Sequence, residues 1–387
     1  MKAPILKAVS MPQKLFWAPI KPALVNIAVQ MAFIVILAGA FRERLNPQIF
    51  IFTIAFVHVI LIFLGIKEPH LSGVLTAWGQ MRQFWDKEGN LKAGRIDTKM
   101  SPDGEGILIN GHRVRVLQLS ENVDFNSDWR RWLLSMARYP VTVRVWQSNR
   151  DTPKIILSSK ENDTYRLREA IGDTQGLLQT LNPQELSVTE TAHIWNDLLS
   201  GGIRYLKTGT LTQQNGREYR ACINIQSWGD FSDSNMIRDL LTLGDGISIH
   251  HWFRALSSAR VNPLLIQQRK MAYLSTFSQN VYNQYTMALE AIDAQTGTSQ
   301  VAVDYALSIW VRTFTETELE TVIEKVRAVL QNYGVKAIRE KKMLKACFLT
   351  QFSDVVSIPR RFLMLSDNVA SELSFTPYEK TFISGEF

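Results

Sequence analysis

Two uninterrupted apolar runs near the N-terminus dominate the pattern of hydrophobic and polar positions along the chain. Residues 22–41 and 47–66 each contain 20 residues without a charged side chain. This is the length that a helix needs to cross the hydrocarbon of a membrane at about 1.5 Å per residue. The second run is the more apolar, because 14 of its 20 residues are Leu, Ile, Phe or Val. We therefore expect two membrane-spanning helices rather than two buried helices of a soluble core.

The short connection between the runs predicts an antiparallel helical hairpin, with both chain ends on one side of the membrane. Only residues 42–46 separate the two runs. Four lysines and no acidic residue precede the first run, whereas the connection carries a net charge of only one, so the positive-inside rule places both termini in the cytoplasm. The residues expected to set this topology are Lys14, Lys21, Arg42, Arg44 and Lys67. We expect residues 1–70 to form this membrane hairpin domain.

Two polar residues interrupt the apolar runs at matching positions. Gln30 lies 14 residues before Arg44 and His58 lies 14 residues after it, so an antiparallel hairpin places both at similar depth. A hydrogen bond between Gln30 and His58 is one hypothesis. The alternative, that each side chain contacts another subunit or its own backbone, carries at least equal weight, because such bonds contribute below about 1 kcal/mol on average.

The pattern changes after the second run and predicts a juxtamembrane linker over residues 71–105, followed by an α+β domain over residues 106–387. Within the linker, Trp78 and Trp85 suit the head-group boundary, although packing in a core is an equal alternative. Two Asn-Gly pairs, at 110–111 and 215–216, lie between β-type runs and predict two antiparallel hairpins.

The clearest element pattern lies in residues 301–338. Apolar residues alternate with polar ones over 301–312, as in a half-buried strand, and then recur at helical spacing after a capping box formed by Thr315 and Glu318. Gly334 ends this helix and a second strand follows. With a helix expected over 233–243 and a strand over 246–256, the pattern predicts a mixed or antiparallel sheet with helices packed on one face.

Charge and cysteine content narrow the possible functions. The first 100 residues hold 12 Lys and Arg against 5 Asp and Glu, and the remaining 287 residues hold 31 of each. Because the basic excess lies beside the membrane, where anionic lipid attracts it, direct nucleic-acid binding by the folded domain is not expected. Cys222 and Cys347 are too few for a disulfide framework and fit a reducing cytoplasm.

No motif nominates a catalytic, cofactor-binding or metal-binding residue. The segment 207–212 is similar to the phosphorylation motif of P-type ATPases, but Leu206 replaces the aspartate nucleophile. His250 and His251 are adjacent in a predicted strand, so their side chains leave opposite faces and cannot share a metal. The chain contains no Gly-Lys pair and therefore no phosphate-binding loop. Four glutamates at 316, 318, 320 and 324 are expected on a solvated helix face.

Several stretches carry a resemblance to known proteins. The tight hairpin followed by Lys67-Glu68-Pro69-His70 resembles the third VirB-series subunit, a small inner-membrane component of bacterial type IV secretion systems. Residues 105–387 resemble the N-terminal region of the fourth subunit, the large secretion ATPase. This second resemblance rests on residues 219–225 with 240–243, 333–335, 343–351, 359–361 and 366–370. Phe352-Ser353-Asp354-Val355 departs from the Pro-Gly-Asn turn usual in that family.

The resemblance implies a fusion of the two subunits that ends before the ATPase domain. It implies an inner-membrane anchor and scaffold in a type IV secretion or conjugation machine. Its expected partners are other inner-membrane secretion subunits, a secretion ATPase domain, membrane lipid and a hexameric assembly. ATP and Mg²⁺ would belong to the family's ATPase domain, so this chain is expected to have no cofactor and no enzymatic activity of its own. Alternatives are the N-terminal portion of a longer ATP-hydrolysing motor, or a membrane-tethered sensor or binding module.

Overall fold

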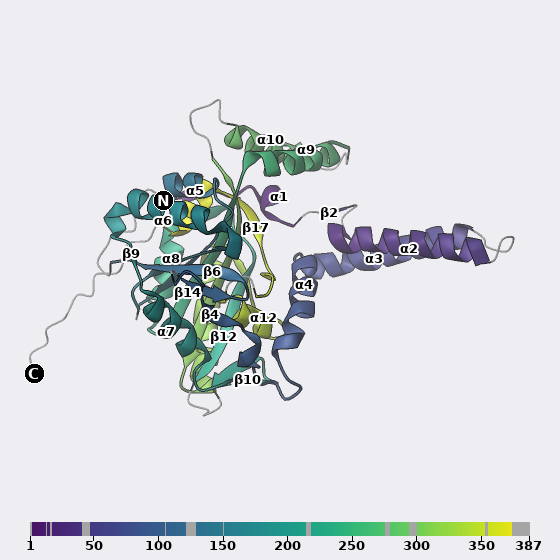
Figure 1. Ribbon diagram of the computed structural model, residues 1–387. Coiled ribbons are helices and arrows are strands. Elements are labelled where there is room, and N and C mark those ends of the chain that lie inside the picture. Colours follow the sequence, from purple (N-terminus) through teal and green to yellow (C-terminus); the bar gives the residue numbers. More distant parts are fainter. Residues whose placement is uncertain are drawn as a thin grey trace, which may run out of the picture.

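The computed structural model describes residues 2–12, 14–15, 18–40, 47–104, 106–120, 129–149, 151–213, 218–274, 279–293, 300–352 and 355–373. Two long helices, α2 (Ile20–Ala40) and α3 (Pro47–Lys67), lie side by side and project from a sheet domain (Figure 1). The connection between them, with Arg42 and Arg44, lies outside the described residues. The Asn215-Gly216 turn and the tail after residue 373 lie outside them as well.

One large antiparallel sheet organises the domain. Among the described residues, thirteen strands join it, and ten of them follow the order β10-β11-β12-β15-β14-β7-β8-β6-β5-β4, while β16 pairs with β12, β17 with β15 and β9 with β6. The strands are β4 (Thr98–Met100), β5 (Ile107–Ile109), β6 (His112–Gln118), β7 (Thr142–Ser148), β8 (Lys154–Lys160), β9 (Gln184–Glu185), β10 (Ile203–Leu206), β11 (Thr210–Gln213), β12 (Tyr219–Ser227), β14 (Ile247–Leu256), β15 (Ala302–Thr313), β16 (Lys336–Arg339) and β17 (Phe362–Leu365).

Helices cover both faces of this sheet, so the expectation of helices on one face is wrong. Two hydrophobic clusters, one on each face, account for the difference. The first cluster includes α5 (Trp129–Met136), α6 (Thr164–Leu177), α8 (Ser234–Leu241), α11 (Glu316–Asn332) and α13 (Ser366–Leu373). The second includes α4 (Leu71–Met81), α7 (Val188–Leu199) and α12 (Leu344–Leu349).

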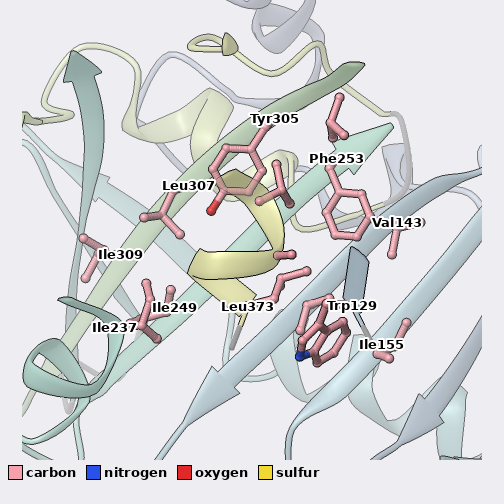
Figure 2. Packing of buried hydrophobic residues seen from close by; sticks show 14 of the residues in the cluster. Trp129, Val143, Ile155, Ile237, Ile249, Phe253, Tyr305, Leu307, Ile309 and Leu373 are labelled. Carbon is pink, nitrogen blue, oxygen red and sulfur yellow. The ribbon is translucent and has the colours of Figure 1, made fainter. Parts of the chain in front are cut away.

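Strand β15 shows why helices cover both faces of the sheet. Tyr305, Leu307 and Ile309 enter the first cluster beside Phe253 of β14 and Trp129 of α5 (Figure 2). On the other face of β15, Ala306 and Trp310 are buried as well, and Trp310 enters the second cluster. The predicted half-buried strand is in fact central, because it pairs with β12 on one side and β14 on the other and has buried side chains on both faces.

The local turn and cap signals are confirmed where the structure describes them. Asn110 and Gly111 have φ values of 48° and 76°, and they join β5 to β6 with Ile109 opposite His112. Both central residues of a type I′ turn need positive φ, which Asn and Gly tolerate. Strands β11 and β12 also pair antiparallel, with Leu211 opposite Arg220.

The predicted strand-helix-strand unit is present as β15, α11 and β16. The backbone N–H of Glu318 donates to the Thr315 hydroxyl at 3.2 Å at the start of α11. Gly334, with φ of 69°, follows its end. Both strands pair with β12, which therefore lies between them. The expected helix over 233–243 and strand over 246–256 are α8 and β14.

Residues 2–10 pack on the sheet domain, although the sequence predicts them as part of a hairpin domain over 1–70. Strand β1 (Lys2–Pro4) pairs antiparallel with β13 (Phe231–Asp233), and Ile5 is buried in the first cluster. Helix α1 (Lys7–Ser10) packs against α10 (Gln279–Ile292). A short ribbon of β2 (Lys14–Leu15) and β3 (Ala18–Pro19) then leads into α2.

Residues 71–105, predicted as a linker, pack onto the domain instead. Within them, α4 is followed by two 3-10 turns, η1 (Arg82–Phe84) and η2 (Ala93–Arg95), and by β4 of the sheet. Ala77, Phe84 and Trp85 are buried in the second cluster. Further 3-10 turns are η3 (Glu161–Asp163) and η4 (Gln179–Leu181), and α9 (Ser258–Leu274) forms a second helical pair with α10.

Helices α2 and α3 coincide closely with the two predicted apolar segments. In the described part of the chain, Ile20–Leu37 is the one segment long and apolar enough to cross a membrane by itself. Residues Ile51–Lys67 pass the same criterion together with Leu71–Phe84, across a bend of 88°. Many of their apolar side chains are exposed, including Phe33, Val35 and Phe56.

Candidate anchor junction

The most unusual polar cluster lies where α3 meets the sheet domain. Helix α3 ends at Lys67, and the chain turns through Glu68, Pro69 and His70 into α4. Proline has no N–H to continue the helical hydrogen bonds, so it favours the break. We define the anchor junction as the cluster of residues that bind this turn: Glu68, His70, Asn224, Gln226, Glu340 and Arg360.

Arg360 is the centre of the anchor junction. Its side chain is 3% exposed, and Nε donates to Oε1 of Glu340 at 2.5 Å. Its Nη1 donates to the carboxylate of Glu68. Burial lowers the pKa of the guanidinium, but the hydrogen bonds and charges of both glutamates outweigh burial and raise that pKa. A planar guanidinium with five donors can bridge two carboxylates in this way, whereas a lysine ammonium lacks the matching fork geometry.

Glu340 connects Arg360 to the middle of the sheet. It is as buried as Arg360, and it also accepts from Nδ2 of Asn224 on β12 at 3.1 Å. The same Nδ2 lies 3.2 Å from Sγ of Cys347 on α12. The buried charges of the junction are therefore paired and hydrogen-bonded, as a low-dielectric interior requires.

His70 fixes the start of α4 to the domain. Its ring is buried 4.7 Å from that of Phe362, edge to face, and its Nε2 lies 3.2 Å from the carbonyl oxygen of Gln226. Burial, reinforced by the charge of Arg360, lowers the pKa of His70 to about 4. The ring is therefore neutral at pH 7, and its Nε2–H donates to that carbonyl. In return, the Gln226 side chain donates to the Lys67 carbonyl at 3.2 Å.

Two glycines let the backbone approach closely beside the junction. A Cβ on Gly73 of α4 would lie 2.3 Å from the carbonyl oxygen of Pro359, the residue before Arg360. A Cβ on Gly65 of α3 would lie 2.7 Å from a ring carbon of Pro19 in β3. Both contacts need a residue without a side chain. The end of α3 is thus held by packing as well as by charge.

The basic residues expected to set topology gather at one end of the helix pair. Lys14, Lys21 and Lys67 are exposed in β2, at the start of α2 and at the end of α3, which is the end nearest the sheet domain. Their role in setting topology stays a prediction, and Arg42 and Arg44 lie outside the described residues.

Polar side chains connect α2 to α3 within the apolar runs. Nδ2 of Asn26 donates to the Ile54 carbonyl at 3.3 Å, and the Thr53 hydroxyl donates to Oε1 of Gln30 at 3.4 Å. His58 is half-buried on α3. The bond between Gln30 and His58 stays a prediction, while Thr53, five positions before His58, is a partner of Gln30 that spacing alone did not suggest.

The two tryptophans of the expected interfacial segment have different environments. Trp85 is buried with its ring edge to face against Phe348, at 6.3 Å. Trp78 is 42% exposed on α4, and the Arg82 guanidinium lies 3.6 Å from the centroid of its ring. Core packing therefore describes Trp85, whereas Trp78 with the exposed Leu75 leaves an aromatic and apolar strip on α4.

The two adjacent histidines lie on opposite faces of β14, as predicted. His251 is fully buried, with Nδ1 2.8 Å from the Tyr305 hydroxyl and Nε2 3.0 Å from Oε1 of Gln147. His250 stacks on Trp146 at 4.7 Å. Burial lowers the pKa of each histidine to about 3. In the portion of the chain that the structure describes, no cluster of three or more His, Cys, Asp or Glu could hold a metal ion.

Both halves of the junction carry a motif in the sequence, but nothing in the sequence pairs them. Lys67-Glu68-Pro69-His70 and Pro359-Arg360-Arg361 were each recognised as motifs, yet Glu68 and Arg360 lie 292 positions apart. The one local signal shared by the two motifs is a charged residue beside a proline, Glu68 beside Pro69 and Arg360 beside Pro359. Only the fold shows that these charges are opposite partners.

Comparison with known proteins finds a family model that matches a region containing the larger part of this junction. Residues 190–361 match the family model described as CagE, TrbE, VirB family, component of type IV transporter system. A search of curated proteins returned no match. The matched region contains Asn224, Gln226, Glu340 and Arg360, whereas Glu68 and His70 precede it.

Proposed function

We propose that this chain is an inner-membrane anchor and scaffold component of a type IV secretion or conjugation machine. The match of residues 190–361 to a type IV transporter component supports the secretion system and, as partners, its other subunits. The apolar helix α2 supports membrane association. The finer assignment, a third-subunit hairpin fused to the N-terminal region of the fourth subunit, is part of the proposal.

The bridge from Arg360 to Glu68 and Glu340 is the observation that carries this proposal. Arg360 and Glu340 belong to the family-matched region, and Glu68 directly follows the end of the projecting helix pair. A buried charge pair is strongly disfavoured once one partner is removed. The proposed anchor and the scaffold therefore form one structural unit.

In this proposal α2 and α3 both span the inner membrane, and the sheet domain lies in the cytoplasm. Lys14, Lys21 and Lys67 cluster at the domain end of the helix pair, which fits the positive-inside rule. The 88° bend after α3 would then lay α4 along the membrane surface. There Trp78 and Arg82 suit the head-group region, because an aromatic ring and a long basic side chain are each apolar at one end and polar at the other.

In this proposal the scaffold binds a separate ATPase domain and is not itself the ATPase. We propose that it docks a secretion ATPase domain within a hexameric assembly, that ATP and Mg²⁺ bind to that domain, and that this chain alone hydrolyses no ATP. The lack of a Gly-Lys pair for a phosphate-binding loop supports this division of labour.

Membrane extraction tests the anchor. The full chain, expressed in a bacterium, should remain in the inner-membrane fraction after alkaline carbonate washing. A Val35→Arg, Phe56→Arg double variant should become extractable, because an arginine at the centre of a span costs about 2.5–3.5 kcal/mol on insertion scales. Tyr165→Arg, at an exposed position of α6, is the control. Extraction of the unaltered chain would refute the anchor.

Nucleotide hydrolysis tests the scaffold. We would measure ATP turnover by the detergent-purified chain alone and after addition of a type IV secretion ATPase domain. Turnover only with the added domain, together with its co-purification, is the expected result. Turnover by this chain alone would refute the assignment of catalysis to another domain.

A further inference from the structure

A second projection leaves the sheet domain on the same side as α2 and α3. Helices α9 and α10 pack together, and in Figure 1 their free end points in the direction of the projecting helix pair. Residues 275–278, which join α9 to α10, lie outside the described residues.

The free end of this second pair has an unusual composition. At this end, residues 267–274 of α9 and 279–286 of α10 contain Arg269 and Lys270 but no Asp or Glu, and they carry Tyr273 and Tyr282. Tyr273 is 73% exposed. Its ring lies 5.9 Å from that of Tyr282, over which the Arg269 guanidinium lies at 6.0 Å. Aromatic rings beside basic groups are typical of a membrane–water interface.

Helix α1 fixes this second pair next to the segment that enters the membrane. The Gln284 side chain accepts from the Ala8 backbone N–H at 2.7 Å, and the Tyr285 hydroxyl donates to the Ala8 carbonyl at 2.9 Å. Val9 is buried in the hydrophobic cluster of α9 and α10. Because α1 leads through β2 and β3 into α2, the orientation of α9 and α10 is coupled to that of the anchor.

We propose that the free end of α9–α10 binds the anionic lipid surface from which α2 and α3 enter the membrane. This inference rests on the proposed insertion of those helices. Arg269 and Lys270 bind lipid phosphates, Tyr273 and Tyr282 lie among the head groups, and the absence of acidic residues from 267–274 and 279–286 removes repulsion from the anionic surface. The domain then contacts the bilayer at two separate places.

Lipid-depth quenching of a fluorophore tests this contact in the full chain. Both native cysteines are buried, so an introduced surface cysteine is labelled selectively in the folded protein. Single variants Tyr273→Cys, Val35→Cys and Tyr165→Cys carry the fluorophore at the free end, within α2 and on α6. Tyr165 is a matched control, because it is 71% exposed and α6 lies on the side of the domain opposite α2 and α3. Vesicles of phosphatidylcholine, with and without phosphatidylglycerol, carry spin-labelled lipids as quenchers.

The three positions separate this inference from the function on which it rests. We expect quenching at Val35 in both vesicle types, quenching at Tyr273 that strengthens with phosphatidylglycerol, and none at Tyr165. Quenching at Val35 without quenching at Tyr273 overturns the second contact and leaves the anchor intact. No quenching at Val35 overturns the anchor, and the second contact with it.

Charge removal identifies the binding groups. Arg269→Gln with Lys270→Gln should weaken the contact of the free end with phosphatidylglycerol vesicles by on the order of tenfold or more, since each basic residue near such a surface contributes about fivefold. Quenching at Val35 should not change. Unaltered quenching at position 273 in this double variant would contradict electrostatic lipid binding. Quenching that does not weaken when salt is added would contradict it as well.

Discussion

Arg360 is a buried cation whose two carboxylate partners come from distant parts of the chain. Arg360→Ala should lower the free energy of unfolding by about 3–5 kcal/mol, because Glu340 would remain buried without its cation. The measurement is urea unfolding of the full chain in detergent. Arg327→Ala is the control, since the exposed Arg327–Glu324 pair should contribute about 0.5 kcal/mol or less. Equal losses in the two variants would contradict the importance of the junction.

Glu372 provides a pH-dependent prediction at the same scale. Burial, together with the nearby charge of Asp233, raises the pKa of this carboxyl to about 8, although the Asp233 backbone N–H donates to it at 3.2 Å. Between about pH 4.5 and pH 8 the unfolded chain ionises Glu372 while the folded chain keeps it protonated, so stability falls as pH rises, by about 1.4 kcal/mol per pH unit.

Glu372→Gln should remove this slope, because an amide stays neutral. We expect the variant to gain stability relative to the unaltered chain as pH rises from about 5 to about 8, with little difference near pH 4, where the carboxyl is protonated in both states. Urea unfolding at each pH measures the two profiles. Parallel profiles would show that the carboxyl ionises in the folded protein as it does in the unfolded one.

The sequence predicts side-chain direction better than side-chain environment. Strand alternation alone places His250 and His251 on opposite faces of β14. The same reasoning cannot distinguish Trp78 from Trp85, because burial depends on α12, which lies more than 250 positions further along the chain. The environment of a side chain is set by long-range packing, about which local periodicity carries no information.

At the scale of elements, α4 shows how closely the segment that follows the helix pair packs on the domain. Gly73→Ala should destabilise the chain by about 1–3 kcal/mol, since the new methyl group would overlap the Pro359 carbonyl. Gly79→Ala on the same helix is a matched control, because a Cβ there meets nothing within 4 Å. It should stabilise by roughly 0.5–1 kcal/mol through helix propensity. Unfolding midpoints of the two variants that move in the same direction would contradict the packing.

The polar contacts between α2 and α3 can be separated by double-mutant cycles. We expect a coupling energy of about 0.5 kcal/mol between Gln30→Leu and Thr53→Val, the average for hydrogen bonds between membrane helices. A parallel cycle with Gln30→Leu and His58→Leu tests the pair suggested by spacing. Stability is measured by unfolding in mixed micelles. Additive effects in either cycle would exclude that pair.

Elements with strong local signals were predictable, and elements positioned by contact were not. The Asn110-Gly111 turn and the Thr315 cap are fixed by backbone chemistry within a few residues, so the pattern identified both. Strand β1 is three residues long, and α4 carries two glycines, so neither has a strong propensity of its own. Pairing with β13 and packing against α12 give them their structure.

At the scale of the whole molecule, the N-terminal strand is held by a helix from the other end of the described chain. The buried Asn368 of α13 donates from Nδ2 to the carbonyl oxygens of Ala3 and Pro4, at 3.3 and 2.9 Å, and to the Ser232 hydroxyl at 3.3 Å. Asn368→Ala should weaken this attachment by about 1–3 kcal/mol, because the carbonyls would lose their donor.

Hydrogen exchange measures that weakening. Amides of residues 2–10 should exchange faster in the Asn368 variant, whereas those of α2 should be unaffected. Asn332→Ala, at an exposed position near the end of α11, is the control. Unchanged exchange in residues 2–10 would mean that pairing with β13 alone holds the strand.

The overall architecture was predicted in outline from two kinds of signal, the long apolar runs and the β-to-α change of period near residue 314. What could not be predicted is how the two parts join. The sequence suggested a membrane unit, a linker and a domain in succession. In the structure, the chain belongs to the sheet domain both before α2 and after α3, because Ile5 and Phe84 are both buried in the core of that domain.

Because the helix pair is attached to the sheet domain at both of its ends, it acts as a rigid lever and not as a flexible tether. A body pinned at one point can swivel about it, but a body pinned at two separate points, here β1 and the anchor junction, loses that freedom. Any rotation of the sheet domain must then tilt α2 and α3 by the same angle or break one of the two attachments. Under the proposed function, work done on the sheet domain would thus reach the bilayer as torque.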